Sequence, residues 1–133
     1  FGALRIAGYN VGSRASLVRA DRLTALKTGS VDFIVSNPPY IAETELPGLE
    51  ASVRDYEPVE ALSGGTDGLM FYRHYAIAAL SVVRGGGRVY CEIGATQEGP
   101  VSRLFEDNGW TEVECIKDLA RRPRVIVART PPC

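Results

Sequence analysis

The stretch VSNPPYI, residues 35–41, places Asn37, Pro38, Pro39 and Tyr40 directly after a run of strand-forming residues. Adjacent prolines cannot donate hydrogen bonds to a sheet ladder, so the strand has to end there. Pro38 restricts Asn37 to extended geometry, and both prolines have a fixed φ angle. The result is a rigid corner with two acceptors, the Asn37 side-chain oxygen and the Pro38 carbonyl, and no proline N–H group to compete with them.

Such a corner suits a planar NH2 group, because two converging acceptors would each hold one of its hydrogens. Tyr40 adds an aromatic face on which the same planar group can pack. An amide or amine held in this way aims its nitrogen lone pair out of the plane, as in-line methyl transfer from a sulfonium requires. The simpler alternative is that the prolines only terminate a strand and that Asn37 is a turn residue.

Apolar runs and periodicities predict the elements that position this corner. Short runs of strand formers lie at residues 15–21, 31–37, 88–94, 111–117 and 124–129. Apolar residues at helical spacing lie at residues 68–83 and 98–109, and residues 1–10 read like the end of a helix. Thr66 or Asp67 can cap the helix at 68–83, and the glycines after it can end it. Residues 41–65 show no period and predict a long loop with one helical turn.

Strands and helices alternate until two consecutive strands close the chain, which predicts an α/β fold. Its sheet is expected to be mainly parallel, with an antiparallel strand at the C-terminal end. The run at 31–37 is nearly all apolar, as in a strand buried on both faces. Ligands of parallel α/β sheets bind beyond the carboxyl ends of the strands, which is where Asn37 stands.

The composition limits the partners and the compartment. The chain has 133 residues and a net charge of −1, so one domain is expected and bulk charge gives no support to a direct nucleic-acid partner. Cys91, Cys115 and Cys133 match no metal-ligand spacing, and their odd number suits a reducing cytoplasm. No apolar run is long enough to cross a bilayer, so we expect a cytoplasmic protein without a membrane partner.

Four motifs together resemble one enzyme family. They are NPPY at 37–40, YEPVEALSGGTDGLMFYR at 56–73, GGGRVYCEIGATQ at 85–97 and DLARRPRVIVAR at 118–129. These motifs are similar to those of the release factor glutamine methyltransferases, the HemK-type enzymes, from about Leu4 to Arg129. The resemblance implies a Rossmann-like class I methyltransferase fold with S-adenosyl-L-methionine (SAM) as cofactor. It also implies methylation of the glutamine amide in the Gly-Gly-Gln motif of peptide chain release factors, a step of translation termination.

The resemblance also implies roles for particular residues. Asn37, Pro38, Pro39 and Tyr40 fall on the catalytic site that binds the substrate glutamine, and Asn37 is also near the cofactor. Asp21 falls where an acidic residue lies beside the SAM adenine. Arg22 takes the neighbouring position, where relatives often carry an aromatic or apolar side chain, and its planar group could stack on adenine.

Four other residues carry less specific expectations. Glu57, Glu92 and Asp118 also match family positions, and a loop-bracing or capping role is at least as good a reading as a chemical one. His74 lies within the predicted helix at 68–83 and is expected to be an ordinary helix residue.

The family's glycine-rich SAM loop and the acidic residue that follows its second strand have no counterpart here. We therefore expect residues 1–133 to be the C-terminal portion of the catalytic domain, without the first two strands and the N-terminal substrate domain. Such a fragment is expected to be inactive alone. In the family's sheet, the strands at 31–37, 88–94, 124–129 and 111–117 are consecutive neighbours. The strand at 15–21 has lost its neighbour, and the strand at 31–37 becomes an open edge.

An open apolar edge is a template for pairing with another chain. We expect residues 1–24 to be displaced or poorly ordered, or the edge at 31–37 to be covered by a second copy. Two other functions stay open at this point. One is a nucleic-acid methyltransferase acting on the exocyclic amine of adenine or guanine, and the other is a non-enzymatic fragment or binding module.

Overall fold

The structure is a computed structural model, and it describes residues 2–132. Its helices are α1 (Gly2–Val11), α2 (Ala51–Arg54), α3 (Val59–Leu62), α4 (Met70–Val82) and α5 (Glu98–Asp107), with short 3-10 turns at Gly12–Arg14 and Leu46–Gly48. Its strands are β1 (Val31–Ser36), β2 (Val83–Glu92), β3 (Thr111–Lys117) and β4 (Pro123–Arg129). None of the helices within residues 2–132 combines the length and apolar character needed to cross a membrane.

The four strands form one sheet in the order β1-β2-β4-β3, the neighbour order expected from the family resemblance. β1 and β2 are parallel, with Ile34 opposite Val89. β4 runs antiparallel to both of its neighbours, β2 and β3. Because the strands β1 and β2 run in the same direction, their carboxyl ends meet at one edge of the sheet, and the site is built there.

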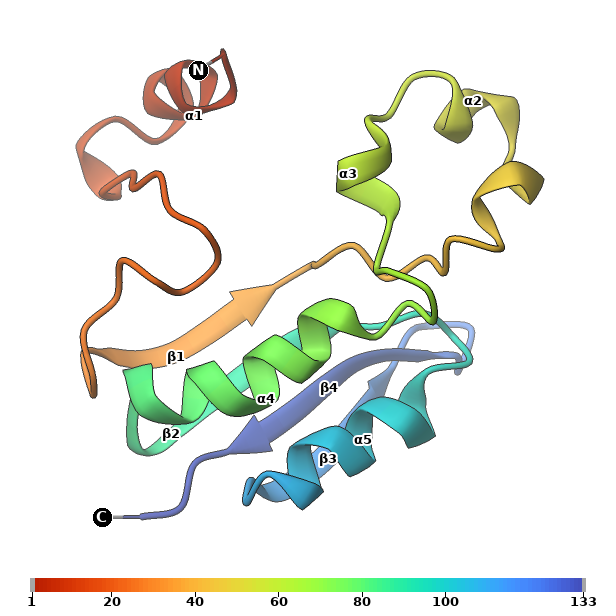
Figure 1. Cartoon of the computed structure of the whole chain (residues 1–133). Helices are drawn as coiled ribbons and strands as arrows, with labels where there is room; N and C mark the ends of the chain where they lie inside the picture. Colours follow the sequence, from red (N-terminus) through yellow and green to blue (C-terminus); the bar gives the residue numbers. More distant parts are fainter. Residues whose placement is uncertain (1, 133) are drawn as a thin grey trace.

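Helices α4 and α5 cover the same face of this sheet (Figure 1). Their inward side chains and the strand residues beneath them form one apolar core, which includes Tyr72, Ala76, Ala79, Val89, Cys91, Val101, Phe105, Ile126 and Ala128. Trp110 closes the core between the two helices: its ring packs edge-to-face on Phe105 at 5.4 Å, and its Nε1 donates a 2.8 Å hydrogen bond to the Ala76 carbonyl. A buried indole N–H needs such a partner, so this bond fixes how α5 and its following turn sit against α4.

The opposite face of the sheet is open, which corrects the expectation that residues 31–37 are buried on both faces. Phe33 and Val35 are 61% and 73% exposed on β1, and Phe33 packs edge-to-face on Tyr90 of β2. β1 is an edge strand, and no helix among the described residues lies over Phe33 and Val35. The apolar run therefore predicted a strand correctly. Whether both faces of that strand are buried depends on elements packed over the sheet, which the run itself does not encode.

The strand predicted at 15–21 is absent. Residues 15–20 are irregular, and Leu17 and Val18 are 43% and 62% exposed. A strand needs a ladder partner for its backbone groups, and no strand within residues 2–132 pairs with this segment. The expected displacement from the sheet is therefore found for residues 15–20, and Figure 1 shows α1 and the coil after it set apart from the sheet.

Three predictions about local structure are corrected. β2 begins at Val83, so the glycines at 85–87 lie inside the strand, next to a register shift against β1. A Cβ at Gly87 would collide with the Asp32 carbonyl, which explains a glycine there. Leu69, not Thr66 or Asp67, is the N-cap of α4, although Asp67 accepts a 3.1 Å hydrogen bond from the Leu69 N–H. The loop at 41–65 holds three short helical segments where one turn was expected.

Candidate functional site

The Asn37–Tyr40 corner follows the last residue of β1, Ser36, at the carboxyl edge of the parallel pair. It lines a cavity of about 170 Å3 together with Ile41, Ala61 and Leu62. Pro38 is buried and anchors the corner, while Asn37 is exposed beside it. The cavity is thus bounded by the rigid corner on one side and by the end of α3 on the other.

The chain that leaves the corner is tied to the glycine-rich turn at 63–68. Ile41 donates a 3.1 Å hydrogen bond to the Leu62 carbonyl and accepts one of 2.9 Å from the Gly64 N–H, and Glu43 donates one of 3.0 Å to the Gly65 carbonyl. Ile41 and Ser63 form a parallel bridge. These bonds close residues 44–61 into a lobe that extends beyond the sheet edge (Figure 1). The SGGTDG block therefore holds the base of this lobe against the corner.

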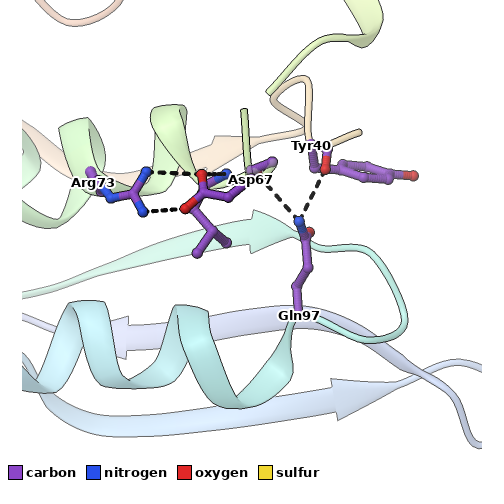
Figure 2. Close-up of polar contacts among 6 residues, drawn as sticks. Tyr40, Asp67, Arg73 and Gln97 are labelled. Atoms are coloured by element: carbon purple, nitrogen blue, oxygen red, sulfur yellow. Dashed lines mark hydrogen bonds and ion pairs between the residues drawn. The ribbon is translucent and has the colours of Figure 1, made fainter. Parts of the chain in front are cut away.

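A third segment reaches the corner through Gln97, at the start of α5. Its side-chain nitrogen donates to the Tyr40 carbonyl at 3.0 Å and to the Gly68 carbonyl at 3.3 Å, as Figure 2 shows. Its side-chain oxygen accepts a 2.9 Å hydrogen bond from the Gly94 N–H, just beyond β2. Gln97 is the last residue of the GGGRVYCEIGATQ motif, and no role was predicted for it. Its place after the second parallel strand was the signal that could have identified it.

Asp67 and Arg73 form an ion pair beside this cluster (Figure 2). Hydrogen bonds from Arg73 are the main cause that lowers the pKa of the Asp67 carboxyl from 3.8 to about 2, and the Leu69 N–H contributes in the same direction. The pair connects the turn at 66–69 to the first turns of α4. Both side chains are about half exposed, so the pair orients this turn at the surface and is not part of the core.

Asp21 and Arg22, expected near the cofactor adenine, do not line the cavity at the corner. Arg22 lies over the ring of Phe71 on α4, 5.4 Å from its centre, and its φ angle is 52°. Asp21 is exposed and lies 3.7 Å from the Arg22 guanidinium. The strand that would have carried Asp21 to the sheet edge is absent. The residues that line the cavity include Asn37 and Pro38, whose amide and carbonyl oxygens are acceptors suited to an NH2 group, while the roles of Asp21 and Arg22 beside the SAM adenine stay predictions.

Asp118 braces a turn, one of the two roles left open for it. Its carboxyl accepts hydrogen bonds from the backbone N–H groups of Ala120 and Arg122 at 2.8 and 3.0 Å, within the β3–β4 connection. The bond from Arg122 is the largest of the causes that lower the pKa of Asp118. Arg124 joins Asp118 to Glu92, with nitrogen–oxygen distances of 3.3 and 3.7 Å.

The remaining candidates lie apart from the corner. Glu57 is exposed in the lobe, and His74 lies on α4 outside the cavity lining. Burial raises the pKa of the Cys91 thiol to about 12, which suits a core residue and not a nucleophile. Within residues 2–132, no three histidine, cysteine or carboxylate side chains are grouped so that they could hold a metal ion.

The chain is similar to known enzymes over most of its length, although no family model matches it. It is 42% identical over 123 residues to the release factor glutamine methyltransferase of Clostridium acetobutylicum, covering 91% of this chain and 43% of that protein. It is 45% identical over 123 residues to the one of Clostridium botulinum, covering 91% and 44%. The chain thus spans less than half the length of these curated relatives.

Solved structures share the fold at lower identity. A methyltransferase from Pyrococcus furiosus has a TM-score of 0.65 at 18% identity, with 96% of this chain and 57% of that chain covered. The Mtq2–Trm112 complex of E. cuniculi has a TM-score of 0.60 at 24% identity, with 96% and 68% covered. The expected Rossmann-like methyltransferase fold is confirmed. The chain is a relative of the release factor glutamine methyltransferases and corresponds to part of their length.

Proposed function

We propose that this chain is the C-terminal portion of the catalytic domain of a cytoplasmic, SAM-dependent methyltransferase. Its substrate is the glutamine of the Gly-Gly-Gln motif in peptide chain release factors, methylated at the side-chain nitrogen N5. The observation that carries the proposal is the Asn37–Tyr40 corner, which lines a cavity at the carboxyl edge of the parallel strands. The identity of 42–45% to enzymes named for this activity supports the same substrate.

In this mechanism the corner orients the amide. The Asn37 side-chain oxygen and the Pro38 carbonyl each accept one N–H of the glutamine NH2 group, and the Tyr40 ring packs on the amide plane. The amide nitrogen then faces the donor with its lone pair, and a gain of this kind is largely orientational. SAM, when bound, supplies the electrophilic methyl group. Asn37, Pro38 and Tyr40 would hold the amide in place while its nitrogen accepts the methyl group and releases one proton to solvent.

The lobe next to the cavity favours a protein substrate over a nucleic acid. The lobe, residues 44–61, carries one basic residue, Arg54, and five acidic ones: Glu45, Glu50, Asp55, Glu57 and Glu60. A nucleic-acid methyltransferase needs a basic channel for the phosphates around a flipped base. An acidic lobe bordering the cavity would repel that backbone.

The cofactor roles of Asp21, Arg22 and Asn37 are part of this proposal. Because Asp21 and Arg22 lie outside the corner cavity, we expect residues 1–133 alone to bind SAM weakly and to be inactive. The expectation is specific to the fragment, since a longer protein can supply the glycine-rich loop that cradles the cofactor in the resembling family. Low-micromolar SAM binding by residues 1–133 in titration calorimetry would contradict it.

The test of the function uses a full-length protein that includes these 133 residues, called the full-length enzyme below. It is incubated with SAM labelled in the methyl group and offered a purified release factor, the same factor with its Gly-Gly-Gln glutamine changed to alanine, or double-stranded DNA. We expect label on the first substrate alone. Label on DNA would favour the nucleic-acid alternative, and label on none of the three would favour a non-enzymatic role.

A further inference from the structure

The peptide group that follows the corner, between Tyr40 and Ile41, is held at both of its ends. Its carbonyl accepts the 3.0 Å hydrogen bond from Gln97, and its N–H donates the 3.1 Å bond to the Leu62 carbonyl. With Pro38 and Pro39 fixed in φ on the other side, little backbone freedom is left between β1 and Ile41. The orientation of the corner therefore depends on these two bonds, and only one of them comes from a side chain.

Gln97 occupies the N-cap of α5, yet its side chain makes no capping hydrogen bond. It extends away from the helix and connects three segments: the corner, the turn at Gly68 and the end of β2 at Gly94. This pattern needs two N–H donors and one acceptor on the same planar group, which a side-chain amide offers and a carboxylate or thioether does not. Glutamine matches these requirements in both chemistry and reach.

The two glycines in this cluster allow the close approach. A Cβ at Gly68 would collide with the Tyr40 carbonyl and would lie 2.7 Å from the Gln97 nitrogen, and the φ angle of Gly68 is +75°. A Cβ at Gly94 would lie 3.1 Å from the Gln97 side-chain oxygen and 3.5 Å from the Tyr40 ring. The backbone at Gly68 and at Gly94 can therefore approach Gln97 closely because neither residue has a Cβ. The glycines and Gln97 form one packed unit around the Tyr40 carbonyl.

We propose that Gln97 is a positioning residue for methyl transfer, which fixes the Asn37–Tyr40 corner relative to the end of β2 by donating to the Tyr40 carbonyl. The inference rests on the proposed function, because the corner matters for catalysis only if it holds the reacting amide. Gln97 itself does not line the cavity, so it acts through Tyr40 and touches no reacting atom. Its loss should lower the rate of the oriented step, kcat, more than it weakens the binding of either substrate.

The kinetic experiment compares two variants with the parent full-length enzyme. Gln97→Met removes every hydrogen bond of the side chain at similar volume. Gln97→Glu keeps an oxygen to accept from Gly94 and replaces the donor nitrogen with an oxygen that faces two carbonyls. We expect kcat to fall by about 10- to 100-fold in both, because displacement of a reacting group by about 1 Å costs up to that much. The KM values for SAM and release factor should stay within about threefold of the parent.

Asn108→Ala is the matched control. Asn108 lies just after the other end of α5, and its side-chain amide donates a 2.8 Å hydrogen bond to the Leu104 carbonyl. The variant removes the same kind of bond from the same helix, away from the corner, and should keep kcat within about twofold of the parent. If Gln97 only stabilised the fold, Asn108→Ala and Gln97→Met would lower kcat alike. That result, or a kcat within twofold of the parent in either Gln97 variant, would overturn the proposal.

Hydrogen exchange gives a readout that does not depend on activity. In the full-length enzyme, mass spectrometry should show faster exchange in Gln97→Met over residues 37–45 and 62–69, and unchanged exchange there in Asn108→Ala. If the parent enzyme does not methylate the release factor, the proposed function fails. Hydrogen exchange alone then tests whether Gln97 fixes the Asn37–Tyr40 corner. Unchanged exchange over residues 37–45 in Gln97→Met would then show that Gln97 does not fix the corner either.

Discussion

The Tyr72 hydroxyl donates a 2.6 Å hydrogen bond to the backbone carbonyl of Glu92, the last residue of β2. Tyr72 lies fully buried on α4, and burial is the main cause that raises the pKa of its hydroxyl. This bond fastens α4 to β2 just before the chain continues to Gly94 and Gln97. The helix that follows the glycine-rich turn and the strand that leads to Gln97 are thereby joined beneath the site.

Tyr72→Phe should destabilise the protein by about 1–3 kcal/mol, because the Glu92 carbonyl loses a buried partner. Urea unfolding of residues 1–133 and of the full-length enzyme measures the change. Tyr90→Phe is the control, since Tyr90 stands on the open face of the same strand and its change should cost less than about 0.5 kcal/mol. Equal losses of unfolding free energy in the two variants would show that the Tyr72–Glu92 hydrogen bond contributes no more to stability than the Tyr90 hydroxyl does.

Asp67→Asn should change how stability depends on acidity. The pKa of Asp67 is lowered to about 2 in the folded protein, so the ion pair with Arg73 contributes fully above about pH 4. The contribution is lost as the pH falls from about 4 to 2, because protonation of the carboxyl then favours the unfolded chain. For a half-exposed pair the effect is about 0.2–1 kcal/mol at neutral pH.

Unfolding by urea between pH 2 and pH 7 tests this expectation. The difference in unfolding free energy between the parent and Asp67→Asn should shrink toward zero at the acid end. Arg73→Gln removes the same pair from the other side and should show the same convergence. A difference that stays constant across this range would contradict the assigned cause.

Asn37→Ala in the full-length enzyme should lower methyl transfer by about 100-fold or more, because one oriented acceptor for the substrate amide is lost. Asn37 is exposed, so the unfolding midpoint should change little. Tyr40→Ala should weaken release factor binding as well as rate. Kinetics with labelled SAM, together with thermal unfolding of both variants, provide the measurement, and near-normal turnover of Asn37→Ala would show that the corner does not hold the glutamine.

The sheet could be predicted from the sequence because its signals are local. Proline pairs, glycine punctuation and short apolar runs marked the strands at 31–37, 88–94, 111–117 and 124–129, and the structure confirms all four, although β2 already begins at Val83. The segment at 15–21 has the same local signal and forms no strand. What decides between them is a ladder partner, and a partner distant in the chain leaves no trace in a short pattern.

The candidate site also combines residues with a local sequence signal and residues whose partners are distant in the chain. Asn37–Tyr40 could be singled out as a candidate because the predicted chemistry of the corner depends on four consecutive residues. The sequence could mark Gln97 only by its place after a parallel strand, because its partners Tyr40 and Gly68 are far from it in the sequence and meet it only at the sheet edge. The expected position of Asp21 at a strand end is wrong because residues 15–20 form no strand, and its role beside SAM stays a prediction.

Residues 1–133 alone should associate in solution through β1. This strand has an open edge among the described residues, and Phe33 and Val35 are exposed on its uncovered face. An exposed apolar edge strand pairs readily with another chain. Light scattering should therefore report a mass of at least twice the 14.4 kDa of one chain at micromolar concentration.

Val35→Lys should shift this equilibrium toward the monomer, because a lysine on an edge strand opposes pairing by charge and by solvation. Val59→Lys is the matched control: Val59 is 57% exposed on α3, in the lobe and not on the sheet. It introduces the same charge and should leave the association unchanged. Equal dissociation in both variants would mean that net charge, and not the open edge of β1, controls the association. A monomer in the parent chain would show that the edge stays unpaired in solution.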